Sequence, residues 1–118
     1  MRIALIAAAA LAAGPGFAAT PVAGADAFNA QCGGCHSLDA ASSPVAPSLK
    51  GVVGRRIAAL PDFQYSDALE AKGGTWTPAA LDAFIADPQA FAPGTAMPVS
   101  TPDRAQRQAI IDYLKTAR

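Results

Sequence analysis

Both cysteines and the single histidine of this 118-residue chain lie within five consecutive residues, Cys32-Gly33-Gly34-Cys35-His36. Two thiols three positions apart can each form a thioether with one of the two vinyl groups of a haem, and the adjacent imidazole can bind its iron. The pattern therefore predicts the covalent attachment of one haem c through Cys32 and Cys35, with His36 as an axial ligand of the iron.

Two other kinds of site use the same pair of cysteines. A thioredoxin-like redox motif follows a buried strand, whereas residues 24–31 are rich in alanine and predict a helix. A structural zinc site usually takes four Cys and His ligands, and this chain has two Cys and one His. We therefore favour the haem site and keep the thiol and zinc sites as weaker alternatives.

The second axial ligand must come from elsewhere in the chain, because there is no second histidine. Once an N-terminal targeting segment is removed, Met97 is the remaining methionine, and the prolines and glycine around it predict a loop. A thioether ligand favours ferrous over ferric iron, which predicts a high reduction potential. With both axial positions filled by His36 and Met97, one-electron transfer is favoured over oxygen or peroxide chemistry.

The first 18 residues have the pattern of a secretory signal peptide. Met1-Arg2 is followed by an apolar run and then by small and helix-breaking residues before Ala18 and Ala19. The run is short of the roughly 20 residues that span a bilayer, so we expect no stable membrane insertion of the mature chain. The pattern predicts cleavage near Ala18, a periplasmic location, and one mature domain over residues 19–118.

Composition limits the partners of this domain. Nine basic and nine acidic residues give a formal net charge of zero, without a basic stripe or a run of like charge. This balance disfavours a nucleic-acid or anionic-lipid partner. The 10 prolines and 10 glycines leave much of the small chain irregular, so a haem at its centre would supply core that the side chains alone cannot.

Helix signals predict an all-α fold of about four helices with long loops. Apolar residues at helical spacing give two of these helices one buried face, and no useful segment alternates apolar and polar residues, so essentially no sheet is expected. Residues 37–50 and 89–100 are predicted to be loops. The expected helices run from about 25 to 30, from the cap Ser66 to about Ala71, from the cap Thr77 to Pro88, and from the cap Thr101 to about Ala117.

Ordered segments along nearly all of the mature chain resemble the class I c-type cytochromes, which include mitochondrial cytochrome c and small periplasmic cytochromes of bacteria. The resemblance implies the small cytochrome c fold around one haem, with electron transfer and no enzymatic activity. It is carried by Gly24 and Phe28, Cys32 to His36, Pro47-Ser48-Leu49, Gly51 to Arg55, Phe63 to Ala68, Gly74-Thr75-Trp76 and Pro93 to Met97.

The resemblance also implies roles for single residues. Gly24 and Phe28 would meet Tyr113 of the last helix, and the carbonyl of Pro47 would accept a hydrogen bond from the His36 ring. The haem propionates, as carboxylates in a partly apolar cleft, need donors. The resemblance assigns this task to Arg55, Tyr65, Trp76 and Thr95.

The sequence departs from the family at the expected docking surface. Mitochondrial members carry lysines around the exposed haem edge, whereas this chain has Gln89, Ala90 and Ala96. No charged residue occurs from Pro88 to Pro102. We therefore expect its redox partners, an electron donor and an acceptor, to dock on an uncharged rim made by Gln31, Gly33 and residues 88–99.

The favoured function is a periplasmic one-electron carrier between respiratory or related redox proteins. The uncharged rim also suits a haem-binding subunit held permanently in a larger periplasmic oxidoreductase complex. A gas sensor or peroxidase would need an open axial position, which Met97 disfavours, and a thiol–disulfide oxidoreductase would need free cysteines.

Overall fold

The computed structural model describes residues 22–118, so the expected signal peptide lies outside the described residues. In the described part, five helices are joined by long loops, and pairing of extended backbone is limited to one antiparallel bridge between Arg56 and Thr75. The predicted all-α class is confirmed. No helix between residues 22 and 118 has the length and apolar character needed to cross a membrane.

Four helices lie where the sequence predicts them, and a fifth is new. The Ser66 hydroxyl accepts from the backbone N–H of Leu69 at 3.3 Å, and Thr77 Oγ1 accepts from Ala80 N–H at 3.1 Å, so both predicted caps are confirmed. The helices are α1 (Gly24–Gln31), α2 (Asp67–Lys72), α3 (Pro78–Ala86), α4 (Pro88–Phe91) and α5 (Arg104–Thr116).

The prediction of an unbroken loop over residues 89–100 is wrong in its first part, where α4 forms. Asp87 ends α3, and its Oδ1 accepts from the N–H of Ala90 at 3.1 Å, which caps a new turn. Pro88 occupies the first position of that turn, where its missing N–H costs nothing. The same proline therefore ends one helix and begins the next.

The predicted cap of the last helix is also wrong. Asp103, not Thr101, precedes α5, and its Oδ1 accepts from the N–H of Gln106 at 2.8 Å. Thr101 is buried, and its N–H donates to the carbonyl of Ile85 at 2.8 Å. Thr101 therefore anchors the preceding loop to the end of α3 and is not available as a cap.

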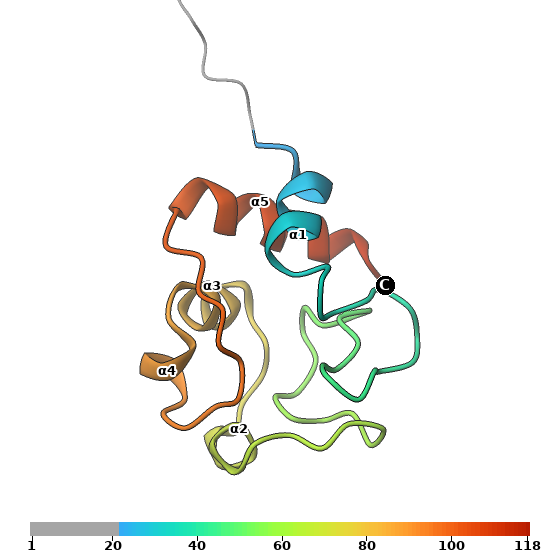
Figure 1. The fold of residues 1–118 in the computed structure, drawn as a ribbon, viewed down its shortest axis with the longest axis vertical. Coiled ribbons are helices and arrows are strands. Elements are labelled where there is room, and N and C mark those ends of the chain that lie inside the picture. The colour runs from blue at the N-terminus through green and yellow to red at the C-terminus, as the bar shows by residue number, and fades with distance from the viewer. Residues whose placement is uncertain (1–21) are drawn as a thin grey trace, which may run out of the picture.

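The first and last helices cross closely at one end of the molecule (Figure 1). A Cβ atom on Gly24 would lie 2.8 Å from both the carbonyl oxygen of Ala109 and Cβ of Tyr113. The rings of Phe28 and Tyr113 lie 5.6 Å apart between centroids. The predicted meeting of Gly24 and Phe28 with Tyr113 is confirmed.

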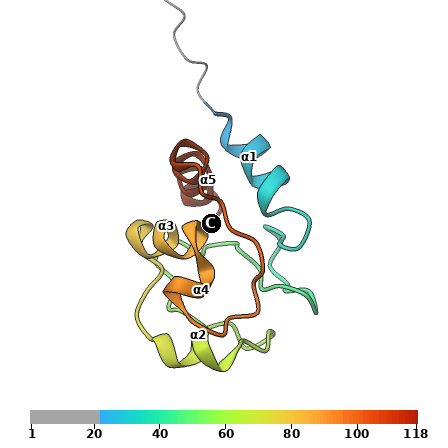
Figure 2. The same ribbon diagram turned by 60° about the vertical axis from the view of Figure 1, so that its left-hand side comes forward.

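The apolar faces of α3 and α5 form the core beneath this crossing. Leu81, Phe84 and Ile85 of α3 are buried, as are Ile110, Ile111 and Leu114 of α5, and Tyr113 is half-buried. Helix α3 packs against both α4 and α5. Figures 1 and 2 show the orange segment after α4 running back to the start of α5, and this segment contains Met97.

Candidate haem-binding site

One cavity of about 300 Å³ brings together all nine residues that the sequence singles out. They come from the turn after α1, from the loops on both sides of α2, and from the segment after α4, so the fold and not the sequence order makes them neighbours. The residues are Cys32, Cys35, His36, Pro47, Arg55, Tyr65, Trp76, Thr95 and Met97. The rest of the lining is mainly apolar.

The attachment segment is a tight turn at the C-terminal end of α1. The Cys32 carbonyl accepts from the N–H of Cys35 at 3.2 Å and from that of His36 at 2.9 Å. The two cysteines are not joined to each other by a disulfide. Burial raises the pKa of Cys32 to about 11, whereas Cys35 is exposed. The turn thus presents two unpaired thiols and an imidazole on one short stretch of chain.

His36 is held in a single tautomer by its ring nitrogen Nδ1, which lies 2.8 Å from the carbonyl oxygen of Pro47. Because a carbonyl can only accept, Nδ1 carries the proton and Nε2 keeps its lone pair. Burial lowers the pKa of His36, with a further contribution from the cation of Arg55, although the Pro47 hydrogen bond opposes the shift. The ring is therefore neutral and able to bind a metal ion.

Met97 reaches the same cavity from the opposite part of the sequence. Its side chain is half-buried and packs against the core, and the preceding turn is closed by a 2.9 Å hydrogen bond from Thr95 N–H to the Ala92 carbonyl. Within residues 22–118, no three His, Cys, Asp or Glu side chains gather as ligands for a bare metal ion. Beside the two thiols, the cavity holds one imidazole, from His36, and one thioether, from Met97.

Arg55 contributes a buried donor that the protein leaves unpaired. Its Nη2 donates to the Ser48 carbonyl at 2.8 Å and its Nη1 to the Lys50 carbonyl at 3.2 Å. In the described part of the chain, Nε of Arg55 is the buried side-chain polar atom that lacks a partner. Burial lowers the pKa of this guanidinium. A buried donor without a partner fits a site that receives an acceptor from a bound group.

Tyr65 and Trp76 lie beside Arg55. The hydroxyl oxygen of Tyr65 accepts from the N–H of Leu60 at 3.3 Å, so its own proton is left to donate. Trp76 is tied to the Arg55 segment by its backbone, since Trp76 N–H donates to the Arg55 carbonyl at 2.8 Å. With the buried Thr95, these residues place several donors on one cavity.

The sequence did not single out several apolar residues of the cavity. Val52, Ile110 and Leu114 belong to its wall, and helical spacing had marked the last two as buried without showing what they face. Val45, which is 72% exposed, and Val99, which is 38% exposed, also line it. Val45 lies in a proline-containing loop, where no periodic pattern shows which residues face a site.

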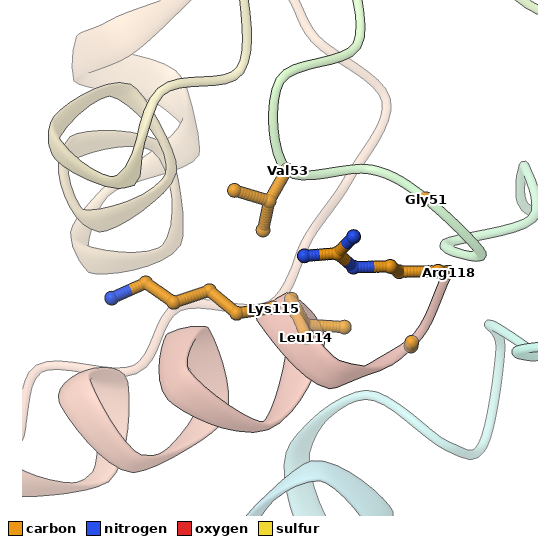
Figure 3. Close-up of a pocket in the computed structure, with 6 residues that line it drawn as sticks. Gly51, Val53, Leu114, Lys115 and Arg118 are labelled. Atoms are coloured by element: carbon orange, nitrogen blue, oxygen red, sulfur yellow. The ribbon is translucent and has the colours of Figure 1, made fainter.

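A second hollow of about 450 Å³ lies at the C-terminal end of α5 (Figure 3). The side chains of Lys115 and Arg118 flank it, and Val53 projects from the neighbouring loop. This hollow has no thiol, imidazole or thioether among its lining residues. The cavity that holds those three groups is therefore the candidate site.

Comparison with known sequences adds an independent line of evidence. The sequence model of the family described as "Cytochrome c" matches residues 21–118. Cytochrome c2 iso-1 of Magnetospirillum fulvum is 40% identical over 95 residues, which cover 78% of this chain and 95% of that protein. A c-type cytochrome of Rhodobacter capsulatus, cyt cy, is 42% identical over 95 residues, and the match covers 80% of this chain but 47% of that longer protein.

A solved structure extends the likeness to the fold. Cytochrome cH from Methylobacterium extorquens superimposes with a TM-score of 0.73 at 39% sequence identity. The match covers 79% of this chain and 94% of that protein. The predicted small cytochrome c fold is thereby confirmed, and the resemblance seen in the sequence segments is matched by the path of the backbone.

Proposed function

The chain belongs to the cytochrome c family, and from this premise we propose that it is a periplasmic one-electron carrier between redox proteins. Its cofactor is one haem c, bonded through Cys32 and Cys35. When bound, this group supplies an iron that gains and loses one electron. The observation that carries the proposal is the single cavity in which two thiols, an imidazole and a thioether meet.

His36 and Met97 are the proposed axial ligands of the iron. The hydrogen bond to Pro47 fixes the His36 ring and leaves the Nε2 lone pair free. The neutral, soft sulfur of Met97 stabilises the ferrous state, so a high reduction potential is expected. Apolar walls around both side chains limit the entry of water, which suits electron transfer without bond making or breaking in a substrate.

Arg55, Tyr65, Trp76 and Thr95 are proposed to hold the two haem propionates. The unpaired Nε of Arg55 and the uncommitted proton of Tyr65 support this role. The indole N–H of Trp76 and the hydroxyl of Thr95 are further donors on the same cavity. None of these four side chains adds a negative charge, so the carboxylates would gain partners without like-charge repulsion.

Redox partners are proposed to dock on the uncharged rim of Gln31, Gly33 and residues 88–99. Val45 and Val99 support this face, because both are exposed and both line the cavity. The same exposed valines favour the second candidate, a haem-binding subunit of a larger periplasmic complex, in which a partner would cover them. Size-exclusion chromatography of an extract from the native cells, followed at a haem wavelength, separates a free carrier from a subunit.

Residues 1–18 are proposed to act as a cleaved signal peptide that directs the domain to the periplasm. The charged start, the apolar run and the small residues before Ala19 support this role. Amino-terminal sequencing of the periplasmic protein tests it, with a new terminus expected near Ala19. A terminus at Met1 would contradict the proposal.

The visible spectrum of the protein tests the proposed function directly. The oxidised and reduced protein, expressed in the periplasm with attachment machinery, is expected to show a c-type haem spectrum. Carbon monoxide added to the reduced sample is expected to change that spectrum only slowly, because both axial positions are filled and the gas must first displace Met97. Rapid binding of carbon monoxide would remove Met97 as a firm ligand and favour sensing or catalysis.

A further inference from the structure

The side chain of Gln89 on α4 forms two hydrogen bonds with the loop that leads to Met97. Its Nε2 donates to the Thr95 carbonyl at 2.8 Å, and its Oε1 accepts from the Gly94 N–H at 3.1 Å. A backbone carbonyl can only accept and a backbone N–H can only donate, so this orientation of the amide is the one that satisfies both. Gln89 thus binds the loop two residues before Met97.

The rest of that loop has few attachments. In the described part of the chain, no hydrogen bond involves residues 96–100. The next anchor is Thr101, whose N–H donates to the Ile85 carbonyl. The segment carrying Met97 is therefore held at two points, by Gln89 at Thr95 and by α3 at Thr101.

Helix α4, which carries Gln89, is short, but several contacts hold it in place. The Asp87 cap closes the turn, and the ring of Phe91 lies 5.7 Å from that of Trp76 in a stacked arrangement. Lys72 of α2 donates to the Phe91 carbonyl at 2.9 Å, and its ammonium lies 4.3 Å from the Phe91 ring centroid. Contacts from three directions therefore hold the helix from which Gln89 reaches the loop.

We propose that Gln89 is a positioning residue for Met97, whose amide keeps the loop closed so that the thioether stays in the cavity. The inference rests on the proposed function, since it takes Met97 as the iron ligand. It gives Gln89 a second task beside its place in the uncharged rim. A side chain that can only donate, such as that of lysine, cannot make both contacts, because Gly94 N–H needs an acceptor.

The test is the rate at which carbon monoxide combines with the reduced holoprotein, because this ligand must displace Met97. Gln89→Met removes both hydrogen bonds at similar length and is expected to raise the rate about fivefold or more. Gln89→Glu keeps the acceptor for Gly94 but sets a carboxylate oxygen against the Thr95 carbonyl, so a rise of similar size is expected. A rate equal to that of the wild type in both variants would overturn the proposal.

Three controls separate positioning from general destabilisation and from failure of the ligand assignment. Gln108→Met makes the same change on an exposed glutamine of α5 whose side chain, among residues 22–118, bonds Asp112 alone, and its rate should match the wild type. Thr77→Ala removes the α3 cap and should lower the denaturation midpoint without raising the rate. Met97→Ala should bind carbon monoxide fast. If it binds no faster than the wild type, the ligand assignment falls, and this inference falls with it.

Discussion

Several polar side chains of the cavity are fixed by hydrogen bonds to the backbone and still keep one polar group free. His36 uses Nδ1 on the Pro47 carbonyl and keeps Nε2. Arg55 uses both terminal nitrogens on backbone carbonyls and keeps Nε. Tyr65 accepts from a backbone N–H and keeps its proton. Because the protein already orders these side chains, less conformational freedom is lost when a bound group completes them.

Removing the Met97 thioether is expected to change the redox chemistry more than the fold. Met97→Ala leaves the iron without its soft sulfur donor, so the midpoint potential should fall by about 0.1 V or more. Potentiometric titration of the holoprotein measures this shift. The far-ultraviolet circular dichroism should stay close to that of the wild type, and an unchanged potential would rule out Met97 as the ligand.

Asp62 is expected to make the free energy of unfolding depend on pH in the acidic range. Its carboxylate accepts from the N–H and from the hydroxyl of Ser42, both at 2.8 Å. The backbone bond first, and then the hydroxyl bond, lower the pKa of Asp62 below its ordinary value of 3.8. A lowered pKa stabilises the folded state above the unfolded-state value, and this contribution is lost as the pH falls through the folded-state value.

The unfolding free energy of the wild type should therefore fall between about pH 5 and pH 2, and that of Asp62→Asn should fall less over the same range. Denaturant titrations across this range, for the variant and the wild type, measure the difference. Asp39→Asn is a matched control, because the Asp39 carboxylate makes no hydrogen bond among residues 22–118. An identical pH dependence in Asp62→Asn and the wild type would show that the Ser42 contacts do not stabilise the fold.

At the scale of the elements, the crossing of α1 and α5 depends on the absence of a side chain at Gly24. The nearest neighbours of a Cβ atom there are the Ala109 carbonyl oxygen and Tyr113 Cβ, both at 2.8 Å. Neither is the far end of a flexible side chain, so relief requires the two helices to separate. The attachment segment begins one residue after α1 ends, and movement of α1 would therefore also displace Cys32.

Gly24→Ala is expected to lower the unfolding free energy by about 1–3 kcal/mol, as overpacking of a close contact does. Guanidinium denaturation of the variant and wild-type holoproteins gives the comparison. Equal midpoints for the two proteins would mean that the helices can separate without cost.

The sequence predicts a helix well where the capping residue interacts only with the helix that directly follows it. Ser66 and Thr77 cap the helices that follow them, as expected, and Gly73 and Gly74, both at positive φ, follow the end of α2. The errors arise where a residue serves two segments. Pro88 was read only as the end of α3, and Thr101 only as a helix cap. In the fold, contacts distant in sequence decide the role of Thr101.

For the whole molecule, the proposed docking on the uncharged rim predicts little electrostatic steering. Residues 88–102 carry no charge, and exposed Val45 lines the same cavity from another loop. A rim of this kind binds partners by excluding water from apolar surface, which salt screens weakly. The balanced net charge of the chain adds no strong overall attraction.

The rate of electron transfer with a purified redox partner is therefore expected to change less than about threefold between low salt and 0.5 M salt. Stopped-flow kinetics over this range measures it. Ala96→Lys places one cation on the rim, and with an acidic partner its rate should become visibly dependent on salt. A steep fall of the wild-type rate with salt would contradict the uncharged docking face.

The sequence predicts more of the residues in the haem cavity than of the residues on the surface around it. A single covalent cofactor requires specific residue types, so Cys32, Cys35 and His36 stand out even without a structure, as does Met97, the methionine that remains once residue 1 is removed. The family resemblance supplies the other five of the nine predicted site residues. No such requirement identifies Val45 or the two hydrogen bonds of Gln89. Those depend on how loops lie against one another, which residue type and spacing do not reveal.

The pairing of α1 with α5 also joins the two ends of the described domain, and it thereby sets an order in time. On a chain that emerges amino end first, Cys32 and Cys35 arrive well before α5. The close approach at Gly24 cannot form until the residues around Ala109 and Tyr113 are present. The packing of the last helix on the first therefore follows the arrival of both thiols, which are present for reaction with a cofactor before the domain is complete.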